Sequence, residues 1–303
     1  MSSELFLPYF GDDVERVHHL GTAHVQKHHR HDRSGRKTYA FNTLGYRGPE
    51  FDPTAERFVF VFGESNAFGS GVEFEESWPL QFTRLWAEQR GVDPSRVCVM
   101  NFAEGGASND YIARMVISQC AAMRPDLMLV NFAEIHRVEG FVGARPYKLG
   151  PWLTRSDTRE QVEAMAPSAL RDTLIERLRR AGGYYEFHSR ETGIAATLRN
   201  VLLVQHYAAS RGIQAFATCN DAHELRSIRK TETGAAIRRL GDQVDRRFLS
   251  DFTITQIPGR KVPREPSVDG IHLGPLRHRV FGEAMHDFAN QYDPRAADAN
   301  TPR

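Results

Sequence analysis

The residues from Phe58 to Phe62 form an unbroken run of aromatic and β-branched side chains that ends at Gly63. A strand with one face in water alternates apolar and polar residues, whereas a run without polar residues suits a strand that is buried on both faces. Such strands occur in parallel sheets that are covered by helices on both sides. This segment therefore predicts a central strand of an α/β sheet.

The same rhythm, an apolar run followed by a helical period, repeats along the chain. Further strands are predicted at 97–102, 127–132 and 214–218, with a short fifth strand at 252–257. Helices are predicted at 76–90, 108–123, 192–211, 235–248 and 275–292. Repeated alternation of strand and helix predicts a parallel sheet between two layers of helices, a three-layer α/β/α fold.

Two segments fall outside this rhythm. Residues 1–50 are polar, aromatic and rich in histidine, and we expect them to form an N-terminal extension that packs on the core. Residues from about 137 to 190 are too many for a simple connection, although 169–180 has the pattern of a helix. We interpret this stretch as an insertion over the edge of the sheet, either a lid or a packed structural excursion, within one domain at 51–303.

The charge balance argues against two classes of partner. Lys and Arg total 39 against 38 for Asp and Glu, so the formal net charge is +1, which gives no long-range attraction to nucleic acid or to an anionic membrane. No stretch approaches the roughly 20 apolar residues of a membrane helix. Residues 1–13 also lack the basic start and apolar run of a signal peptide. We therefore expect a cytoplasmic protein without nucleic-acid or membrane partners, and the sequence indicates no oligomeric state.

Neither cysteine nor histidine has the spacing of a metal site. The three cysteines, Cys98, Cys120 and Cys219, are far apart and include no C-x-x-C pair, so we interpret them as small core residues. The early histidines follow no ligand spacing and have no supporting cysteine or carboxylate pattern; they are His18, His19, His28, His29 and His31. A solvated segment explains them better than a metal site.

Polar residues with a known chemical partnership follow the predicted strands. In parallel sheets, sites form beyond the carboxyl ends of the strands. Ser65 follows the first strand, and Asp269 and His272 precede the last helix. A serine hydroxyl is a weak nucleophile that needs a base. Histidine suits this role because its pKa lies near neutrality. A nearby carboxylate can fix the tautomer of the imidazole. Glycine turns such as Gly105-Gly106 offer backbone N–H groups to a developing oxyanion.

Taken in order, these segments resemble the blocks of the SGNH (GDSL-like) hydrolase family. Residues 63–65, GES, with 68–72, FGSGV, are similar to its first block, and 101–108, NFAEGGAS, to its second. DGIH at 269–272 is similar to its closing Asp-x-x-His, and NTLGYRG at 42–48 to a lead-in of many members. The resemblance covers roughly 42–133 and 269–289.

The resemblance implies a flavodoxin-like three-layer fold and a catalytic triad. Ser65 would be the nucleophile, His272 the base and Asp269 the carboxylate that orients the base. Backbone N–H groups of Ser65 and Gly106 would line the oxyanion hole. No metal and no organic cofactor is implied.

The chain departs from the family pattern at two places. Glu64 stands where the family has Asp, and that side chain is not catalytic in the family. After the third strand the family has Gly-x-Asn-Asp, whose Asn completes the oxyanion hole, but Ile135 falls at the position of that Asn. Loss of one oxyanion donor costs on the order of 10²–10³ in rate. The residues that could replace it are Asn131, Asn109, His136 and Arg137.

Two classes of function are consistent with these residues. The first is a serine esterase that cleaves short-chain or O-acetyl carboxylic esters of small molecules or carbohydrates through an acyl-serine, with O-acyl transfer as a related activity. The second is a catalytically impaired binding or structural module on the same fold, which the altered third block favours.

Overall fold

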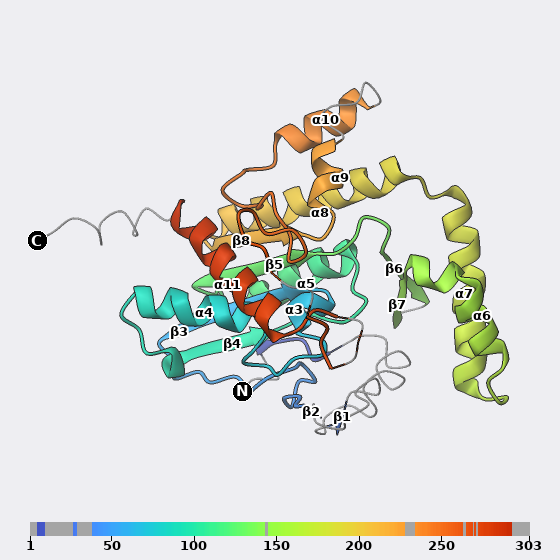
Figure 1. Ribbon diagram of the computed structural model, residues 1–303, viewed down its shortest axis with the longest axis horizontal. Helices are drawn as coiled ribbons and strands as arrows, with labels where there is room; N and C mark the ends of the chain where they lie inside the picture. The colour runs from blue at the N-terminus through green and yellow to red at the C-terminus, as the bar shows by residue number, and fades with distance from the viewer. Residues whose placement is uncertain are drawn as a thin grey trace, which may run out of the picture.

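The computed structural model describes residues 5–9, 27–28, 38–142, 145–227, 234–262, 265–268, 270 and 272–292 of the chain. Its centre is a four-stranded sheet in the order β4-β3-β5-β8 (Figure 1). The strands are β3 (Arg57–Gly63), β4 (Val97–Asn101), β5 (Leu127–Phe132) and β8 (Gln214–Cys219). All three pairings are parallel, which confirms the predicted sheet.

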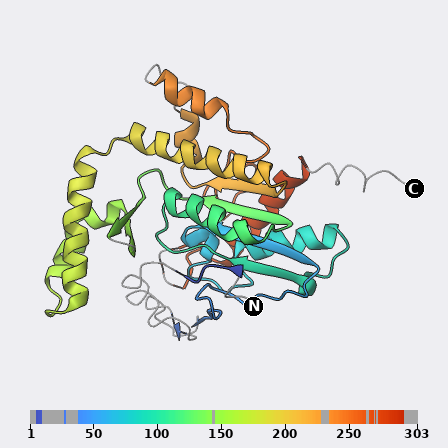
Figure 2. The ribbon, with the colours of Figure 1, turned by 180° about the vertical axis from the view of Figure 1, so that it is seen from behind.

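Helices cover both faces of the sheet, as expected for strands without polar alternation. On one face lie α4 (Trp78–Gln89) and α11 (Pro275–Asn290), and on the other α5 (Asn109–Ala122) and α8 (Arg190–Ser210) (Figures 1 and 2). Because successive side chains of a strand point to opposite faces, Val59 and Val61 join the core beneath α4 and α11. Phe60 and Phe62 join the core beneath α5 and α8. The fold is therefore a three-layer α/β/α sandwich.

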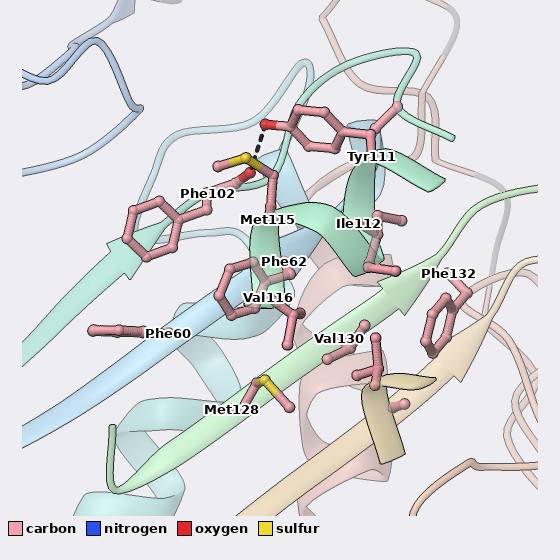
Figure 3. Close-up of a cluster of buried hydrophobic side chains, with 14 of the residues drawn as sticks. Phe60, Phe62, Phe102, Tyr111, Ile112, Met115, Val116, Met128, Val130 and Phe132 are labelled. Atoms are coloured by element: carbon pink, nitrogen blue, oxygen red, sulfur yellow. Dashed lines mark hydrogen bonds between the residues drawn. The ribbon is translucent and has the colours of Figure 1, made fainter. Parts of the chain in front are cut away.

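The core under α5 combines aromatic rings with aliphatic and methionine side chains (Figure 3). The rings of Phe62 and Phe102 stack with centroids 5.3 Å apart, and Phe60 meets Phe102 edge-on at the same distance. Tyr111 of α5 is buried, and its hydroxyl donates to the carbonyl of Phe102 at 3.0 Å. This contact attaches α5 to the segment that follows β4, one of the segments that carry the candidate site.

The predicted fifth strand is wrong in position. Residues 252–257 do not form a strand; the amide of Gln256 bonds back to the carbonyl of Thr253, which makes a turn. A single parallel bridge joins Leu249 to Ala217 of β8 and marks the fifth position instead. The helix predicted at 235–248 is shorter, α10 (Ala235–Asp242). Counting the Leu249 bridge, the spatial order of strands is 2-1-3-4-5, the flavodoxin-like order.

The segment predicted as an insertion leaves the sheet and forms its own small core. It contains β6 (Val138–Val142), β7 (Arg145–Leu149), η2 (Pro151–Thr154), α6 (Ser156–Glu163) and α7 (Ala169–Phe187). Leu149, Leu153 and Leu178 are buried together in a cluster separate from the two sheet cores. Figure 1 shows α6 and α7 at one side of the molecule, with the β6–β7 hairpin between them and the sheet.

The remaining elements are short. They are β1 (Lys27–His28), β2 (Thr38–Tyr39), α3 (Ser65–Phe68), η1 (Pro94–Arg96) and α9 (Ala222–Ser227). Within the first fifty residues, Phe6 packs edge-on against Phe60 with centroids 5.5 Å apart. His18, His19, His29 and His31 lie outside the described residues. The three cysteines are unpaired and buried, as the sequence predicted. Among the described helices, none combines the length and apolar character that a membrane crossing requires.

Candidate functional site

The candidate site lies where the strand order reverses. Strands β4 and β5 flank β3 on opposite sides. The connection that leaves the carboxyl end of β3 leads to β4, and the one that leaves β5 leads to β8, so the two diverge in opposite directions along the sheet. In open α/β sheets, ligands bind in the crevice at this point. The residues that follow β3 are Glu64 and Ser65, and those that follow β5 run from Ala133 to Arg137.

Ser65 is the first residue of α3, a single helical turn. Glu64 caps this turn, because its carboxylate accepts the amide of Asn66 at 2.9 Å. Gly69 ends the turn in the left-handed conformation, with φ of 80°. Ser65 is 8% exposed, and its hydroxyl donates to Glu64 Oε2 at 2.7 Å. The predicted nucleophile is therefore held by its own neighbour in this structure.

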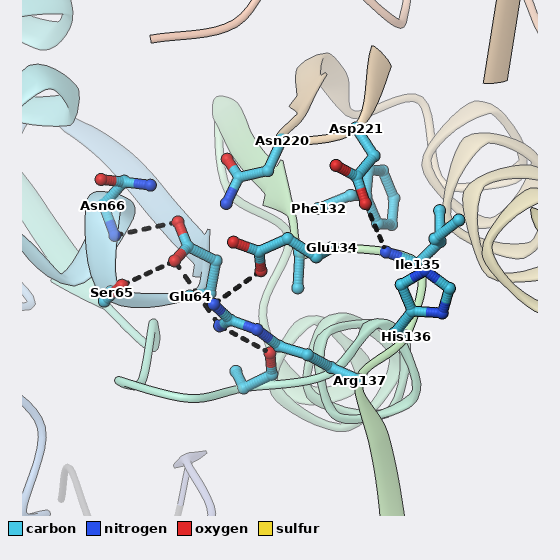
Figure 4. Close-up of polar contacts among 12 residues, drawn as sticks. Glu64, Ser65, Asn66, Phe132, Glu134, Ile135, His136, Arg137, Asn220 and Asp221 are labelled. Atoms are coloured by element: carbon cyan, nitrogen blue, oxygen red, sulfur yellow. Dashed lines mark hydrogen bonds and ion pairs between the residues drawn. The ribbon is translucent and has the colours of Figure 1, made fainter. Parts of the chain in front are cut away.

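Glu64 is fully buried and is the centre of a polar network (Figure 4). In addition to Ser65 and Asn66, its carboxylate accepts from Asn131 Nδ2 at 3.0 Å and lies 3.7 Å from the guanidinium of Arg137. A buried carboxylate is tolerated only when donors and cations surround it. No role was expected for this side chain from the sequence, yet it directly contacts the predicted nucleophile. The feature of the sequence that could have indicated this role is the replacement of the family Asp by Glu64.

Asn131, expected as an oxyanion donor, lies beside Gly63 in the sheet and is fully buried. Its amide nitrogen donates to Glu64 and also to Asn220 Oδ1 at 3.1 Å. It would have to release Glu64 before it could bind an oxyanion.

The alternative amide, Asn109, donates to Thr197 Oγ1 at 2.9 Å and accepts the amide of Ala133 at 2.7 Å. It fastens α5 to α8 and to the end of β5. Ile135, at the position of the family Asn, is 3% exposed, and its aliphatic side chain offers no hydrogen-bond donor. The ring of His136 packs edge-on against that of His188.

Arg137 connects three parts of the site. Its guanidinium pairs with Glu134 at 2.6 Å, lies near Glu64, and covers the ring of Trp152 with 5.1 Å to the centroid. Burial raises the pKa of Glu134; the charge of Arg137 opposes this, while the charges of Glu64 and Asp221 add to it. Arg137 thus joins the insertion to the acidic side chains beside Ser65.

The second block reaches the first through the backbone. The amide of Glu104 donates to the carbonyl of Gly63 at 3.0 Å, and Asn101 Nδ2 donates to the carbonyl of Ala67 at 3.0 Å. Gly106 follows in the left-handed region, with φ of 73°, a conformation that glycine adopts at little cost. The turn that carries the expected oxyanion donor is therefore fixed to the end of β3, beside Ser65.

The closing block approaches the same loop. The amide of Val268 donates to the carbonyl of Gly71 at 3.4 Å, and the amide of Ser267 donates to the carbonyl of His272 at 2.9 Å. His272 is half-buried. Asp269, its expected partner, lies outside the described residues. The backbone thus joins the turn that carries the predicted base to the glycine-rich loop that follows Ser65.

Arg47, in the NTLGYRG segment, supports this glycine-rich loop from beneath. It is 2% exposed, and its guanidinium donates to the carbonyls of Phe68 and Val72, each at 2.7 Å, and to that of Gly69. The guanidinium also lies over the ring of Tyr39 at 4.4 Å. Burial lowers the pKa of Arg47 to about 10. This structural role of Arg47 was not expected from the sequence, where the segment entered only as part of the resemblance.

A cleft of about 480 Å³ opens elsewhere on the described surface, between the end of α9, the 251–262 segment and the start of α11. Its polar lining includes Arg226, Asp251, Lys261 and Arg277, and none of the expected site residues takes part. Within the described part of the chain, no group of three or more His, Cys, Asp or Glu side chains has the arrangement of a metal site.

No protein-family model and no curated protein matches the sequence. Several solved structures are similar. TesA is 12% identical over 77% of this chain and 97% of its own, with a TM-score of 0.41. The psychrotrophic esterase EstA from Pseudoalteromonas sp., in a form inhibited by monoethylphosphonate, is 10% identical over 78% and 98%, with a TM-score of 0.44. A protein of the G-D-S-L family from Desulfitobacterium hafniense DCB-2 is 11% identical over 77% and 99%, with a TM-score of 0.39. At these identities and TM-scores, the function has to be argued from the residues of this chain.

Proposed function

We propose that this protein is a serine esterase of the SGNH type that cleaves short-chain or O-acetyl carboxylic esters through an acyl-serine. One observation carries the proposal. Ser65 stands at the carboxyl end of β3 at the switch point of the sheet, and the Gly105-Gly106 turn is fixed beside it by the bond from Glu104 N to Gly63 O. A hydroxyl next to a turn rich in backbone donors is the arrangement that acyl transfer requires.

In the proposed reaction, Ser65 Oγ attacks the ester carbonyl carbon while its proton passes to His272. The carbonyl oxygen becomes an oxyanion, which the N–H groups of Ser65 and Gly106 stabilise. When the tetrahedral intermediate collapses, the C–O bond to the alcohol breaks, and His272 returns the proton to the leaving alkoxide. Water then attacks the acyl-serine in the same way, with His272 first accepting and then donating a proton. The products are the free acid and Ser65, and neither a metal nor a cofactor takes part.

In the proposed mechanism, the hydrogen bond from Ser65 to Glu64 belongs to the enzyme before it reacts. A hydroxyl carries one proton, so it cannot donate to Glu64 Oε2 and to His272 at the same time. In the reacting state, the Ser65 hydroxyl would have to turn from Glu64 to His272. Glu64 is a poor candidate for the base, because its carboxylate already accepts from Asn66 and Asn131 and lies 3.7 Å from the guanidinium of Arg137.

The same bond favours a second candidate, a binding module that has lost catalysis. Its support is the buried Ile135 at the third block together with the Ser65 hydroxyl held by Glu64. The two candidates differ in whether the hydroxyl reacts.

The test is hydrolysis of p-nitrophenyl esters of increasing acyl length by the wild type and by Ser65→Ala and His272→Ala. We expect kcat to fall by on the order of 10⁴-fold or more in both variants, because nucleophile and base act as a unit. Ser70→Ala is the matched control, since Ser70 is a buried serine five residues further along the same loop. A fluorophosphonate adduct that maps to Ser65 would identify the nucleophile. Equal rates in the wild type and both variants would leave the binding module as the better account.

A further inference from the structure

Lys148 is a buried lysine whose ammonium group lies against the second block. It belongs to β7 of the insertion and is 4% exposed. Its Nζ donates to the carbonyl of Gly105 at 2.8 Å and lies 3.3 Å from Glu104 Oε1. Burial of an ammonium group is costly unless it is paired. The contacts with Gly105 and Glu104 are therefore what allows Lys148 to be buried here.

The carbonyl that Lys148 holds belongs to the peptide unit of the expected oxyanion donor. The C=O of Gly105 and the N–H of Gly106 are two ends of one planar peptide group and point in opposite directions. A cation on the oxygen therefore fixes the direction of the N–H. It also polarises the peptide and strengthens the N–H as a donor, because linked hydrogen bonds reinforce one another.

Without Lys148, a second orientation would be open to the Gly105–Gly106 peptide. The amide of Ala107 bonds to the carbonyl of Glu104 at 3.1 Å, so residues 104–107 form a β-turn with Gly105-Gly106 at its centre. The φ of 73° at Gly106 is that of the third residue of a type II turn. Type I and type II turns differ by rotation of the central peptide. Two adjacent glycines allow that rotation, and a Cβ added at Gly105 would meet no heavy atom within 4 Å beyond its chain neighbours.

We propose that Lys148 is a positioning residue of the oxyanion hole: its ammonium group holds the Gly105–Gly106 peptide in the type II orientation, with the Gly106 N–H toward the reacting carbonyl. This inference rests on the proposed function. It also gives the insertion a chemical role, since the β6–β7 hairpin delivers the cation to the turn.

Lys148 also faces the buried carboxylate of Glu104, and this second role has to be separated from the first. If Lys148 only neutralised Glu104, removal of both charges would restore activity. If it orients the peptide, removal of both would not. The double variant Lys148→Met/Glu104→Gln distinguishes these roles.

The experiment compares kcat and KM of the wild type, Lys148→Met and the double variant on the same p-nitrophenyl ester. We expect kcat to fall by about 10- to 100-fold in both variants with little change in KM, since a misdirected donor costs most of what a deleted donor costs. Arg114→Met is the control: Arg114 pairs with Glu139 of the same hairpin at 2.7 Å and does not contact the turn. It should keep kcat within about twofold of the wild type.

A thionoester analogue provides a readout that a structural role would not move. Sulfur accepts N–H bonds more weakly than oxygen, so an intact oxyanion hole prefers the ester over the thionoester. We expect this preference to shrink in Lys148→Met and to persist in Arg114→Met. If Lys148→Met fails to fold, Lys148→Gln, which keeps a neutral donor, carries the same comparison and should show an intermediate loss.

Three results would overturn the inference. They are a Lys148→Met enzyme with wild-type kcat, a double variant that recovers wild-type kcat, and an unchanged preference for the ester. Hydrolysis that does not depend on Ser65 is a different failure, since it would remove the proposed function first and this inference with it.

Discussion

We expect the protein to lose stability in acid because of one buried histidine, His278. It lies in α11 without solvent exposure, and its Nδ1 accepts the amide of Trp78, the first residue of α4, at 3.2 Å. Burial lowers the pKa of His278 from 6.5 to about 3, with smaller contributions from the charges of His272 and Arg47. The folded protein therefore keeps this ring neutral, whereas the unfolded chain binds a proton below pH 6.5.

The direction and size of the change in the free energy of unfolding follow from this difference in pKa. Because the folded pKa lies below the unfolded one, His278 favours the folded state fully above pH 6.5 and progressively less as the pH falls from 6.5 toward 3. Each pH unit in this window lowers the free energy of unfolding by about 1.4 kcal/mol. At pH 5, His278 alone should therefore make the free energy of unfolding about 2 kcal/mol lower than at pH 7.

The perturbation is His278→Asn, whose side-chain oxygen can still accept the amide of Trp78 but does not titrate. Urea unfolding followed by tryptophan fluorescence at pH 7, 6 and 5 gives the free energy of unfolding of each protein. We expect the decrease between pH 7 and pH 5 to be smaller in the variant by about 2 kcal/mol. Other titrating groups, including Glu134, are common to both proteins and cancel in this difference.

His206→Asn is the control, because His206 is an exposed histidine of α8. Its decrease between pH 7 and pH 5 should equal that of the wild type. If His278→Asn loses as much stability as the wild type over this range, the buried neutral ring is not the cause and the reasoning fails.

Two further predictions concern the scaffold of the site. Arg47→Met should lower the free energy of unfolding by about 3 kcal/mol or more, because three buried carbonyls lose their donor; a loss below about 1 kcal/mol in urea unfolding would contradict this. Gly63→Ala should cost about 1–3 kcal/mol, since its new Cβ would lie 2.6 Å from Ala67 Cβ and 3.0 Å from that of Asn131. Gly182→Ala, in the interior of α7 with nothing within 4 Å of the new methyl group, should instead stabilise by about 1 kcal/mol. Thermal midpoints that shift in the same direction for both glycine variants would refute the steric argument.

The sequence determined the layers of the fold and the order of the site segments. Unbroken apolar runs fixed the strands: β5 has the predicted bounds, Leu127–Phe132, and β3 contains the predicted 58–62. These patterns are local, because burial on both faces removes polar residues from each strand separately. Once the strands are parallel, their carboxyl ends share one edge, so the segments that follow β3 and β4 meet there, as the bond from Glu104 N to Gly63 O shows.

Tertiary structure alone decided which polar groups touch. The bond from Ser65 to Glu64, the three carbonyls on Arg47 and the ammonium of Lys148 on Gly105 join residues whose contacts have no periodic signal. The Lys148 contact spans 43 positions in the chain. The turn at 253–256 and the bridge from Leu249 to Ala217 of β8 likewise have no periodic signal in the sequence. A side chain is recruited to a site by the path of the backbone in space, and that path is the sum of packing over the whole domain rather than a property of any short segment.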